Sequence, residues 1–417
     1  MKEQNNKIDR RNFLKTMGAA GIGSVFASAS VKADPNNVKG TDPNAAEKTQ
    51  ETKYPQVPRR KLGKTGVDVP VLSFGAMFNI VDNQIILRKC LDWGVDYWDT
   101  AHSYANGNSE VGIGKFFSMN PDVRKKVFLV TKASDAKNAA DLEKRLQESL
   151  KRMNTEYIDL YYGVHGLSKP EDLTEELRQW VMDAKKRKLI RYFGFSTHGN
   201  TANCLAGAAK LDWIDAIMTT YNIRTMQESP MQDAVGACNK AGIGLIAMKV
   251  LARGQKIETE EDKKLANHFL ERGFAEGQAK IKAVLEDARI STACITMQNV
   301  ALVTSNVAAV LDQTKLTQAD KQVFNEYAKI TCDGYCAGCG YICNAAVPDT
   351  PYVNDVMRYL MYYNSYGNRD MARELFAQIP HDVRSKLLST DYCVAEARCP
   401  QHLPIGKLVA EAVDKLA

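Results

Sequence analysis

The sequence predicts an α/β protein with a (β/α)8 TIM barrel, followed by a small, mainly helical C-terminal domain that is rich in cysteine. Between residues 59 and 330, short β-branched runs alternate with amphipathic segments about eight times, as the strands and helices of such a barrel do. No G-x-G-x-x-G follows the first strand, which counts against a Rossmann sheet. Six of the ten cysteines fall after residue 330, so the last part of the chain is organised differently.

The composition is that of an ordinary globular protein. The chain has 417 residues, of which 45% are hydrophobic and 25% are charged, so collagen, coiled-coil and largely disordered structures are excluded for most of it. The net charge is only +6, and no block of basic residues is interleaved with aromatic ones. We therefore expect no nucleic acid among its partners.

The first 33 residues have the organisation of a targeting segment. A basic opening with Arg10 and Arg11 is followed by a mildly apolar run over 16–29 and then by small residues. The adjacent arginines resemble a twin-arginine signal, and this resemblance implies export of a folded protein by the twin-arginine machinery to a bacterial periplasm. A frayed basic terminus is the alternative. Residues 34–57 are polar and lack an apolar period, which predicts a flexible linker. No apolar run reaches the length of about 20 residues that a stable membrane span requires.

The expected barrel elements follow one another in the order of the chain. Local patterns predict strands at 71–77, 95–100, 127–131, 157–162, 191–196, 216–219, 244–248 and 293–296, and helices at 84–93, 139–153 and 172–186.

Four ionisable residues stand at or just after consecutive predicted strands. Asp99 and Tyr104 follow the second strand, Lys132 ends the third and His165 follows the fourth. Alone, each has an ordinary explanation: a helix cap, a solvated lysine or a packed histidine. The carboxyl ends of barrel strands form one ring, however, so these four side chains are expected to converge on a single site.

This combination is suited to proton transfer at a carbonyl group. A phenol is a poor acid at neutral pH, and a neighbouring ammonium group lowers its pKa. We expect Lys132 to do this to Tyr104, Asp99 to hold Lys132 in an ion pair, and His165 to donate a hydrogen bond to a substrate oxygen. Tyr104 would then be the general acid of carbonyl reduction and the base of alcohol oxidation.

Residues 59–330 resemble the aldo-keto reductase family. The resemblance rests on Asp99-Thr100-Ala101-x-x-Tyr104, on Val130-Thr131-Lys132 and on the run Tyr157–Leu160 that leads to His165. It implies a (β/α)8 barrel that binds a nicotinamide cofactor, a small carbonyl or alcohol substrate, and a catalytic role for all four residues.

The same resemblance implies where the nucleotide binds. The positions that match the family's nucleotide-binding residues are Ser196, Thr197, Tyr221, Lys249, Gly254 and Asn306. Tyr221 stands where the family has the aromatic residue that stacks on the nicotinamide. Thr197 replaces the family's Asn, and no Lys or Arg lies between Ile295 and Asn306 to pair with a 2′-phosphate, so NADP and NAD are both expected cofactors. His198 is interpreted as a solvated loop residue.

The cysteines after residue 330 have the spacing of cluster ligands. Cys336, Cys339 and Cys343 form a C-x2-C-x3-C run, and Cys399 precedes a proline, a pattern that favours one [4Fe–4S] cluster. Disulfides, which export favours, and a zinc site are the alternatives. Cys332 and Cys393 are left without a role.

Residues 331–417 also resemble the ferredoxin-like extension of certain exported aldo-keto reductases. The predicted domains are therefore a signal peptide (1–33), a linker (34–57), a reductase barrel (58–330) and a [4Fe–4S] domain (331–417). The sequence predicts an exported oxidoreductase that interconverts a carbonyl and an alcohol, with a redox partner protein for its cluster. The alternative is an iron–sulfur electron-transfer or binding protein whose barrel only holds a nucleotide.

Overall fold

The computed structural model describes residues 54–134, 136–252, 260–330, 335–336, 340–364, 368–399 and 401–417, with only the backbone at 262 and 341. The expected signal peptide and most of the linker lie outside the described residues, as do Gly254, Cys332 and Cys339. Among the described residues, no helix combines the length and the apolar character that crossing a bilayer requires.

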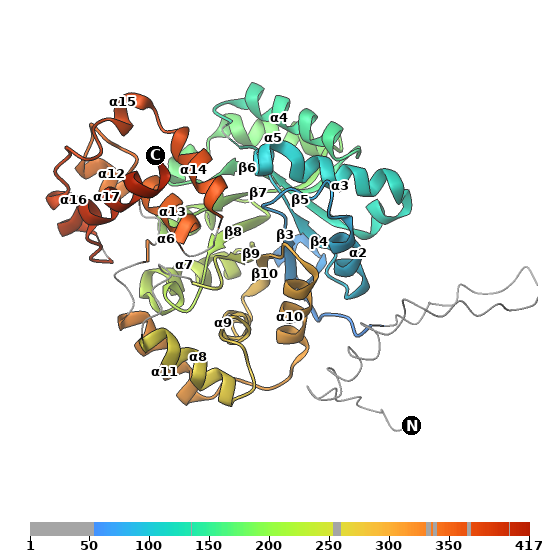
Figure 1. Ribbon diagram of the computed structural model, residues 1–417. Helices are drawn as coiled ribbons and strands as arrows, with labels where there is room; N and C mark the ends of the chain where they lie inside the picture. The colour runs from blue at the N-terminus through green and yellow to red at the C-terminus, as the bar shows by residue number, and fades with distance from the viewer. Residues whose placement is uncertain are drawn as a thin grey trace, which may run out of the picture.

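The centre of the protein is a closed barrel of parallel strands (Figure 1). In barrel order they are β3 (Leu72–Gly75), β4 (Tyr97–Asp99), β5 (Phe128–Lys132), β6 (Ile158–His165), β7 (Ile190–Thr197), β8 (Ala216–Thr220), β9 (Gly244–Met248) and β10 (Ile290–Thr296), and β10 pairs with both β9 and β3. Alternate side chains point inward, so Leu160, Met218 and Ile246 fill the interior. The predicted (β/α)8 barrel is confirmed.

Amphipathic helices surround the barrel and bury one face each against its outer surface. They are α2 (Gln84–Asp92), α3 (Asn108–Met119), α4 (Ala139–Arg152), α5 (Glu175–Lys186), α6 (Thr201–Ala208), α7 (Ser229–Lys240), α9 (Glu276–Leu285) and α10 (Val300–Leu311). In α4, Asn138 caps the first turn by accepting a hydrogen bond from the Asp141 amide, and Leu142 and Leu146 are buried. Two further helices, α8 (Glu260–Glu271) and α11 (Gln318–Ile330), pack together through stacked Phe269 and Phe324 rings.

A short hairpin that the sequence did not predict closes the amino-terminal end of the barrel. It consists of β1 (Arg59–Lys61) and β2 (Asp68–Pro70), and it places Leu62 in the interior of the barrel. Gly63 in its turn has a φ of +51°, and a Cβ there would lie 2.3 Å from the Gly242 carbonyl oxygen, so only glycine fits.

The end of the expected linker belongs to the barrel. The Val57 amide donates to the Trp93 carbonyl at 3.0 Å, and the Val57 side chain is buried. Residues 54–57 thus pack onto the barrel, because Tyr54 contacts the Trp93 ring and Val57 belongs to the same apolar core as Trp93.

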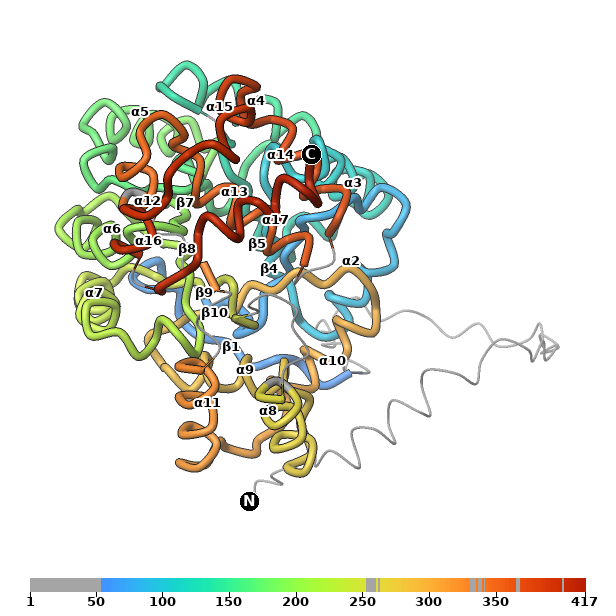
Figure 2. Tube along the Cα trace, turned by 60° about the vertical axis from the view of Figure 1, so that its left-hand side comes forward, coloured from blue at the N-terminus to red at the C-terminus, as the bar shows by residue number. Residues whose placement is uncertain are grey.

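The C-terminal segment is helical and has a core of its own. Its helices are α12 (Gly340–Ala346), α13 (Val353–Asn364), α14 (Arg369–Ala377), α15 (His381–Arg384), α16 (Cys393–Arg398) and α17 (Ile405–Leu416). α13 lies at the centre, where Val356 and Leu360 pack with Phe376 and Val409. Figures 1 and 2 show this unit lying across one end of the barrel, with α13 closest to the strands. The buried side-chain amide of Asn222, which follows β8, donates to the Tyr335 hydroxyl at 2.9 Å and so ties the two parts together.

Candidate active site

Asp99 and Lys132 form a buried ion pair at the carboxyl ends of two neighbouring strands. β4 and β5 are paired, so the two side chains lie side by side, and Lys132 Nζ is 2.5 Å from Asp99 Oδ1 and 2.7 Å from the Thr100 carbonyl oxygen. Burial opposes the charge of Lys132, but Asp99 and Tyr104 together raise the pKa of the lysine above its ordinary value. Lys132 is therefore a cation throughout the neutral range.

Tyr104 lies beside this ion pair. Its ring centroid is 4.8 Å from Lys132 Nζ, close enough for the ammonium charge to act on the phenol. Burial nevertheless raises the pKa of Tyr104 to about 12, with Lys132 acting in the opposite direction. Lys132 acts in the expected direction, but desolvation of the phenolate outweighs its attraction, so the net shift of the Tyr104 pKa is upward.

His165 faces Tyr104 from the end of β6. The two ring centroids are 6.1 Å apart, and His165 Nδ1 is 3.0 Å from the Ser134 hydroxyl. Burial, with Lys132 and Arg358 adding to it, lowers the pKa of His165 to about 3, so the imidazole is neutral. The structure therefore brings all four expected catalytic residues together. Ser134, which sequence reasoning missed, orients the imidazole.

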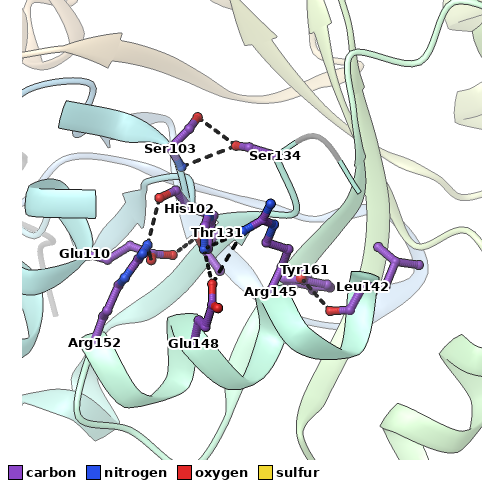
Figure 3. Close-up of polar contacts among 10 residues, drawn as sticks. All are labelled: His102, Ser103, Glu110, Thr131, Ser134, Leu142, Arg145, Glu148, Arg152 and Tyr161. Carbon is purple, nitrogen blue, oxygen red and sulfur yellow. Dashed lines mark hydrogen bonds and ion pairs between the residues drawn. The ribbon is translucent and has the colours of Figure 1, made fainter. Parts of the chain in front are cut away.

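A network of polar contacts supports the turn that carries Tyr104 (Figure 3). The turn is unusual because Ala105, Asn106 and Gly107 all have positive φ, at 50°, 53° and 88°. Arg152 reaches across from α4 and donates to the His102 carbonyl at 2.8 Å and to Glu110 Oε2 at 3.1 Å. Strained residues of this kind persist only where their surroundings hold them.

Glu110 connects this network to the strand that carries Lys132. Its side chain is fully buried, and it accepts a hydrogen bond from Thr131 at 2.7 Å as well as the contact from Arg152. Tyr104 and Lys132 are therefore positioned by one continuous set of contacts.

Of the expected nucleotide-binding residues, Ser196 and Thr197 lie at the barrel mouth. Ser196 Oγ accepts from the Gly166 amide at 3.1 Å, and Thr197 donates to the Gly199 carbonyl at 3.1 Å. Lys249 follows β9, is partly buried and has a φ of +54°. Asn306 is buried on α10, and Gly254 lies outside the described residues.

Tyr221 does not present its ring to the barrel mouth, where Ser196 and Thr197 lie. Its ring has no exposed surface and packs with the outer layer of the barrel, where its hydroxyl donates to Asp287 at 2.6 Å and accepts from Gln232 at 3.0 Å. This placement leaves no ring face open for stacking, so the stacking role stays a prediction that the packing does not support. The pattern Tyr221-Asn222 carried no information about which way the ring points.

His198 lies inside the mouth instead of in solvent, which corrects the expectation for it. Its Nδ1 is shielded from solvent and has no hydrogen-bond partner among the described residues, and the same holds for the Thr220 hydroxyl at the end of β8. Burial lowers the pKa of His198 well below its ordinary value. Unsatisfied buried polar atoms at the ends of β7 and β8 fit the amide and phosphate groups of a nicotinamide nucleotide.

Three of the four expected cluster ligands belong to one core of the C-terminal unit, because Cys399 is part of that core and Cys336 and Cys343 pack against it. The pKa of the Cys343 thiol is raised to about 12, first by burial and then by Cys336 and Cys399, whose charges both act on it. Cys339 lies outside the described residues, and among the residues that are described no three His, Cys, Asp or Glu side chains already form a metal-binding group. Cys393 is exposed and interacts with Asp391 instead.

Comparison with known proteins identifies the barrel. The family model described as "Aldo/keto reductase family" matches residues 73–329. The aldo-keto reductase yakc [NADP(+)] of Schizosaccharomyces pombe is 31% identical over 218 residues, which cover 48% of this chain and 62% of that protein. The L-glyceraldehyde 3-phosphate reductase of Escherichia coli is 25% identical over 225 residues, covering 48% of this chain and 64% of that protein.

A solved structure supports the fold. The holo form of an aldo-keto reductase from Bacillus halodurans superposes with a TM-score of 0.55 at 24% identity, covering 65% of this chain and 96% of that one. The C-terminal unit lies beyond the matched residues 73–329, and the chain spans less than two thirds of the two curated relatives. The match nevertheless includes all eight barrel strands, apart from Leu72 at the start of β3, and it includes the site at the barrel mouth. The chain therefore belongs to the aldo/keto reductase family.

Proposed function

We propose that this protein is an exported oxidoreductase that interconverts a carbonyl and an alcohol at the mouth of its barrel. The observation that carries the proposal is the convergence of Tyr104 with the buried Lys132–Asp99 pair and the neutral imidazole of His165. A phenol, a cation beside it and a neutral hydrogen-bond donor are what proton transfer to a carbonyl oxygen requires.

Each residue has a defined part in the proposed reaction. In reduction, the Tyr104 hydroxyl gives its proton to the carbonyl oxygen, and His165 donates a hydrogen bond from Nε2 while Ser134 engages Nδ1. In oxidation, Tyr104 takes the proton back. When bound, a nicotinamide nucleotide supplies or accepts the two electrons together with the hydrogen at carbon, so the redox change balances.

The nucleotide would be held by Ser196, Thr197, Lys249 and Asn306 together with the unpartnered groups at the ends of β7 and β8. The name of the S. pombe relative includes NADP(+), whereas the present chain offers no Lys or Arg between Ile295 and Asn306. Both NADPH and NADH therefore belong in the assay.

We further propose a [4Fe–4S] cluster on Cys336, Cys339, Cys343 and Cys399. Its support is the ligand spacing and the packing of Cys336, Cys343 and Cys399 on one core of the C-terminal unit. When bound, such a cluster would supply one-electron transfer or a structural link between the segment that carries Cys336, Cys339 and Cys343 and the residue that follows α16, Cys399.

Export by the twin-arginine route to the periplasm completes the proposal, and Arg10 and Arg11 support it. Replacing both with lysine should leave the protein in the cytoplasm, which cell fractionation measures. Correct export of this variant would contradict the proposed route.

The decisive experiment is carbonyl reduction by the mature, anaerobically prepared protein with either nucleotide, with Tyr104→Phe in parallel. General acid catalysis contributes about 10²–10⁴-fold, so the variant should lose that much of kcat. Tyr161→Phe is the control, because it removes only a 3.4 Å contact to the Leu142 carbonyl behind the barrel wall. Equal rates for Tyr104→Phe and the parent would refute the proposed chemistry.

A second candidate is an electron-transfer or binding protein whose barrel only holds a nucleotide. The packing of Cys336, Cys343 and Cys399 on one core favours it. In that case no carbonyl is turned over, and Tyr104→Phe leaves the redox behaviour of the cluster unchanged.

A further inference from the structure

Two serines connect the turn that carries Tyr104 to His165. Ser103 directly precedes Tyr104, and its carbonyl accepts a hydrogen bond from the Asn106 amide at 3.1 Å, so it belongs to the same turn. Its hydroxyl donates to Ser134 Oγ at 2.8 Å, and its amide donates to the same oxygen at 3.4 Å (Figure 3). Ser134 Oγ is in turn 3.0 Å from His165 Nδ1. The contacts therefore join the segments that follow β4 and β5 to the end of β6.

The direction of these hydrogen bonds follows from the donors that each group has. A serine hydroxyl has one hydrogen and two lone pairs. Ser103 supplies one hydrogen to Ser134 Oγ from its hydroxyl and another from its amide, so both lone pairs of that oxygen are in use. The hydrogen of Ser134 is then donated to His165 Nδ1. A hydrogen on Nδ1 would bring three donors to one oxygen and leave the Ser134 hydrogen with no acceptor among the described residues.

The accepting role of Nδ1 determines where the imidazole carries its own hydrogen. His165 is neutral near pH 7, because burial above all lowers its pKa to about 3. A neutral imidazole has a single N–H, so an unprotonated Nδ1 places that hydrogen on Nε2. Nε2 has no hydrogen-bond partner within the described part of the chain, and the side chain is only partly buried. This nitrogen is therefore available to donate to a ligand.

We propose that Ser103 and Ser134 are positioning residues that hold the His165 imidazole in the tautomer with its hydrogen on Nε2. The inference rests on the proposed function, in which this hydrogen is donated to the carbonyl oxygen that Tyr104 protonates. The other tautomer would present a lone pair to that oxygen and repel it. Because Ser103 lies in the Tyr104 turn, the same contacts fix the phenol and the imidazole relative to each other.

Nuclear magnetic resonance tests the tautomer without requiring turnover. The full-length mature protein is labelled with 15N in its histidine side chains, and the signals of His165 are those that disappear in His165→Gln. Long-range 15N–1H correlation at neutral pH distinguishes protonated from unprotonated ring nitrogens. In the parent, Nδ1 should be unprotonated and Nε2 protonated. Ser134→Ala should give a mixture of the two tautomers, because Nδ1 then has lost its donor, and Ser103→Ala, at an exposed position, should shift the populations in the same direction.

Carbonyl reduction tests the role of the serines. Removal of a preorganised donor costs about 10²–10³ in kcat, so Ser134→Ala, which only loosens this donor, should lower kcat about tenfold and change KM little. In His165→Gln the same substitution should have no further effect, because Ser134 acts through the imidazole. Ser103→Thr keeps the hydroxyl and should recover the rate that Ser103→Ala loses. Ser118→Ala is the control, because the Ser118 hydroxyl donates to the Gly114 carbonyl on α3.

The outcomes separate this inference from the proposed function. A hydrogen on Nδ1 in the parent, or unchanged tautomers in Ser134→Ala, would overturn the inference. An equal loss of kcat from Ser134→Ala in the parent and in His165→Gln would also overturn it, and would make the serine a general support of the fold. Reduction that depends on Tyr104 but not on Ser134 would leave only the proposed function standing. The expected tautomer in a protein that reduces no carbonyl would refute the proposed function and leave the tautomer assignment standing.

Discussion

At the residue scale, the acidity of Tyr104 is set by burial against the charge of Lys132. With a pKa of about 12, the phenol is protonated through the whole neutral range. We expect carbonyl reduction to be independent of pH from about 6 to 10, and alcohol oxidation to rise about tenfold per pH unit, since the ionised fraction rises that way below the pKa. Steady-state kinetics in both directions measure this.

A plateau of the oxidation rate below pH 9 would contradict this assignment of the proton acceptor. Lys132→Met supplies a second check. Loss of the ammonium raises the pKa of Tyr104 further, so oxidation at a given pH should fall.

His165 gives stability a predictable dependence on acid. Its pKa is about 3 in the folded protein and about 6.5 when unfolded, so between these values the unfolded chain binds the proton and the folded one does not. The contribution of the neutral imidazole to the free energy of unfolding is fully present above pH 6.5 and is lost as the pH falls toward 3. His165→Gln should therefore show a shallower fall in Tm over this window. His381→Gln, at an exposed position, should keep the slope of the parent.

The convergence of the four proposed catalytic residues could be predicted because barrel topology alone brings consecutive strand ends together. The direction of the net pKa shift of Tyr104 could not be predicted, because it depends on how completely the phenol is desolvated. The placement of His198 and the direction of the Tyr221 ring could not be predicted for a related reason: side-chain direction at a strand end depends on the register, which a short motif does not specify.

At the scale of elements, α4 supports the turn that carries Tyr104. Arg152→Met removes the contacts to the His102 carbonyl and to the buried carboxylate of Glu110. We expect the free energy of unfolding to fall by about 1–3 kcal/mol, and kcat to fall more than KM rises, because the strained turn loses its support. Thermal unfolding and steady-state kinetics measure the two effects.

Arg145→Met is the matched control, two turns earlier on α4. Arg145 lies 3.5 Å from both Glu148 and His102 and is about a third exposed, so its loss should cost less than about 1 kcal/mol. If both variants behaved alike, Arg152 would have no special role in positioning Tyr104.

Most elements were predictable from local patterns. The eight strands lie within a few residues of the expected ranges, because β-branched runs and helical periods alternate clearly along the chain. The hairpin β1–β2 was missed because its strands have three residues each and include Arg59, Lys61 and Asp68, so neither length nor alternation marks them.

At the scale of the whole molecule, the proposed cluster predicts iron in the C-terminal unit. Anaerobically purified protein should contain about four iron atoms per chain. Cys399→Ser should lose them, because Cys399 is one of the four proposed ligands. Cys393→Ser, which alters an exposed cysteine, should keep them. Iron analysis and visible absorbance give the result.

Full iron content in Cys399→Ser would remove this residue from the ligand set. Zinc in place of iron, or a disulfide detected by thiol titration, would support one of the two alternatives that the spacing left open.

The covering of the barrel by α13 could not have been predicted. The segment 353–364 has an ordinary amphipathic pattern, which predicts a helix with a buried face but not which surface it meets. The placement of this helix across the end of the barrel is visible only in the tertiary structure.

The position of α13 in the chain also determines when the site is completed. All eight barrel strands emerge from the ribosome before Val353, so the barrel can close while its mouth is still uncovered. A chain that ends prematurely after α11 would have every proposed catalytic residue but none of the helices that lie across the end of the barrel. The barrel therefore depends only on residues that are made early, whereas the covering of its mouth depends on the last residues to be translated.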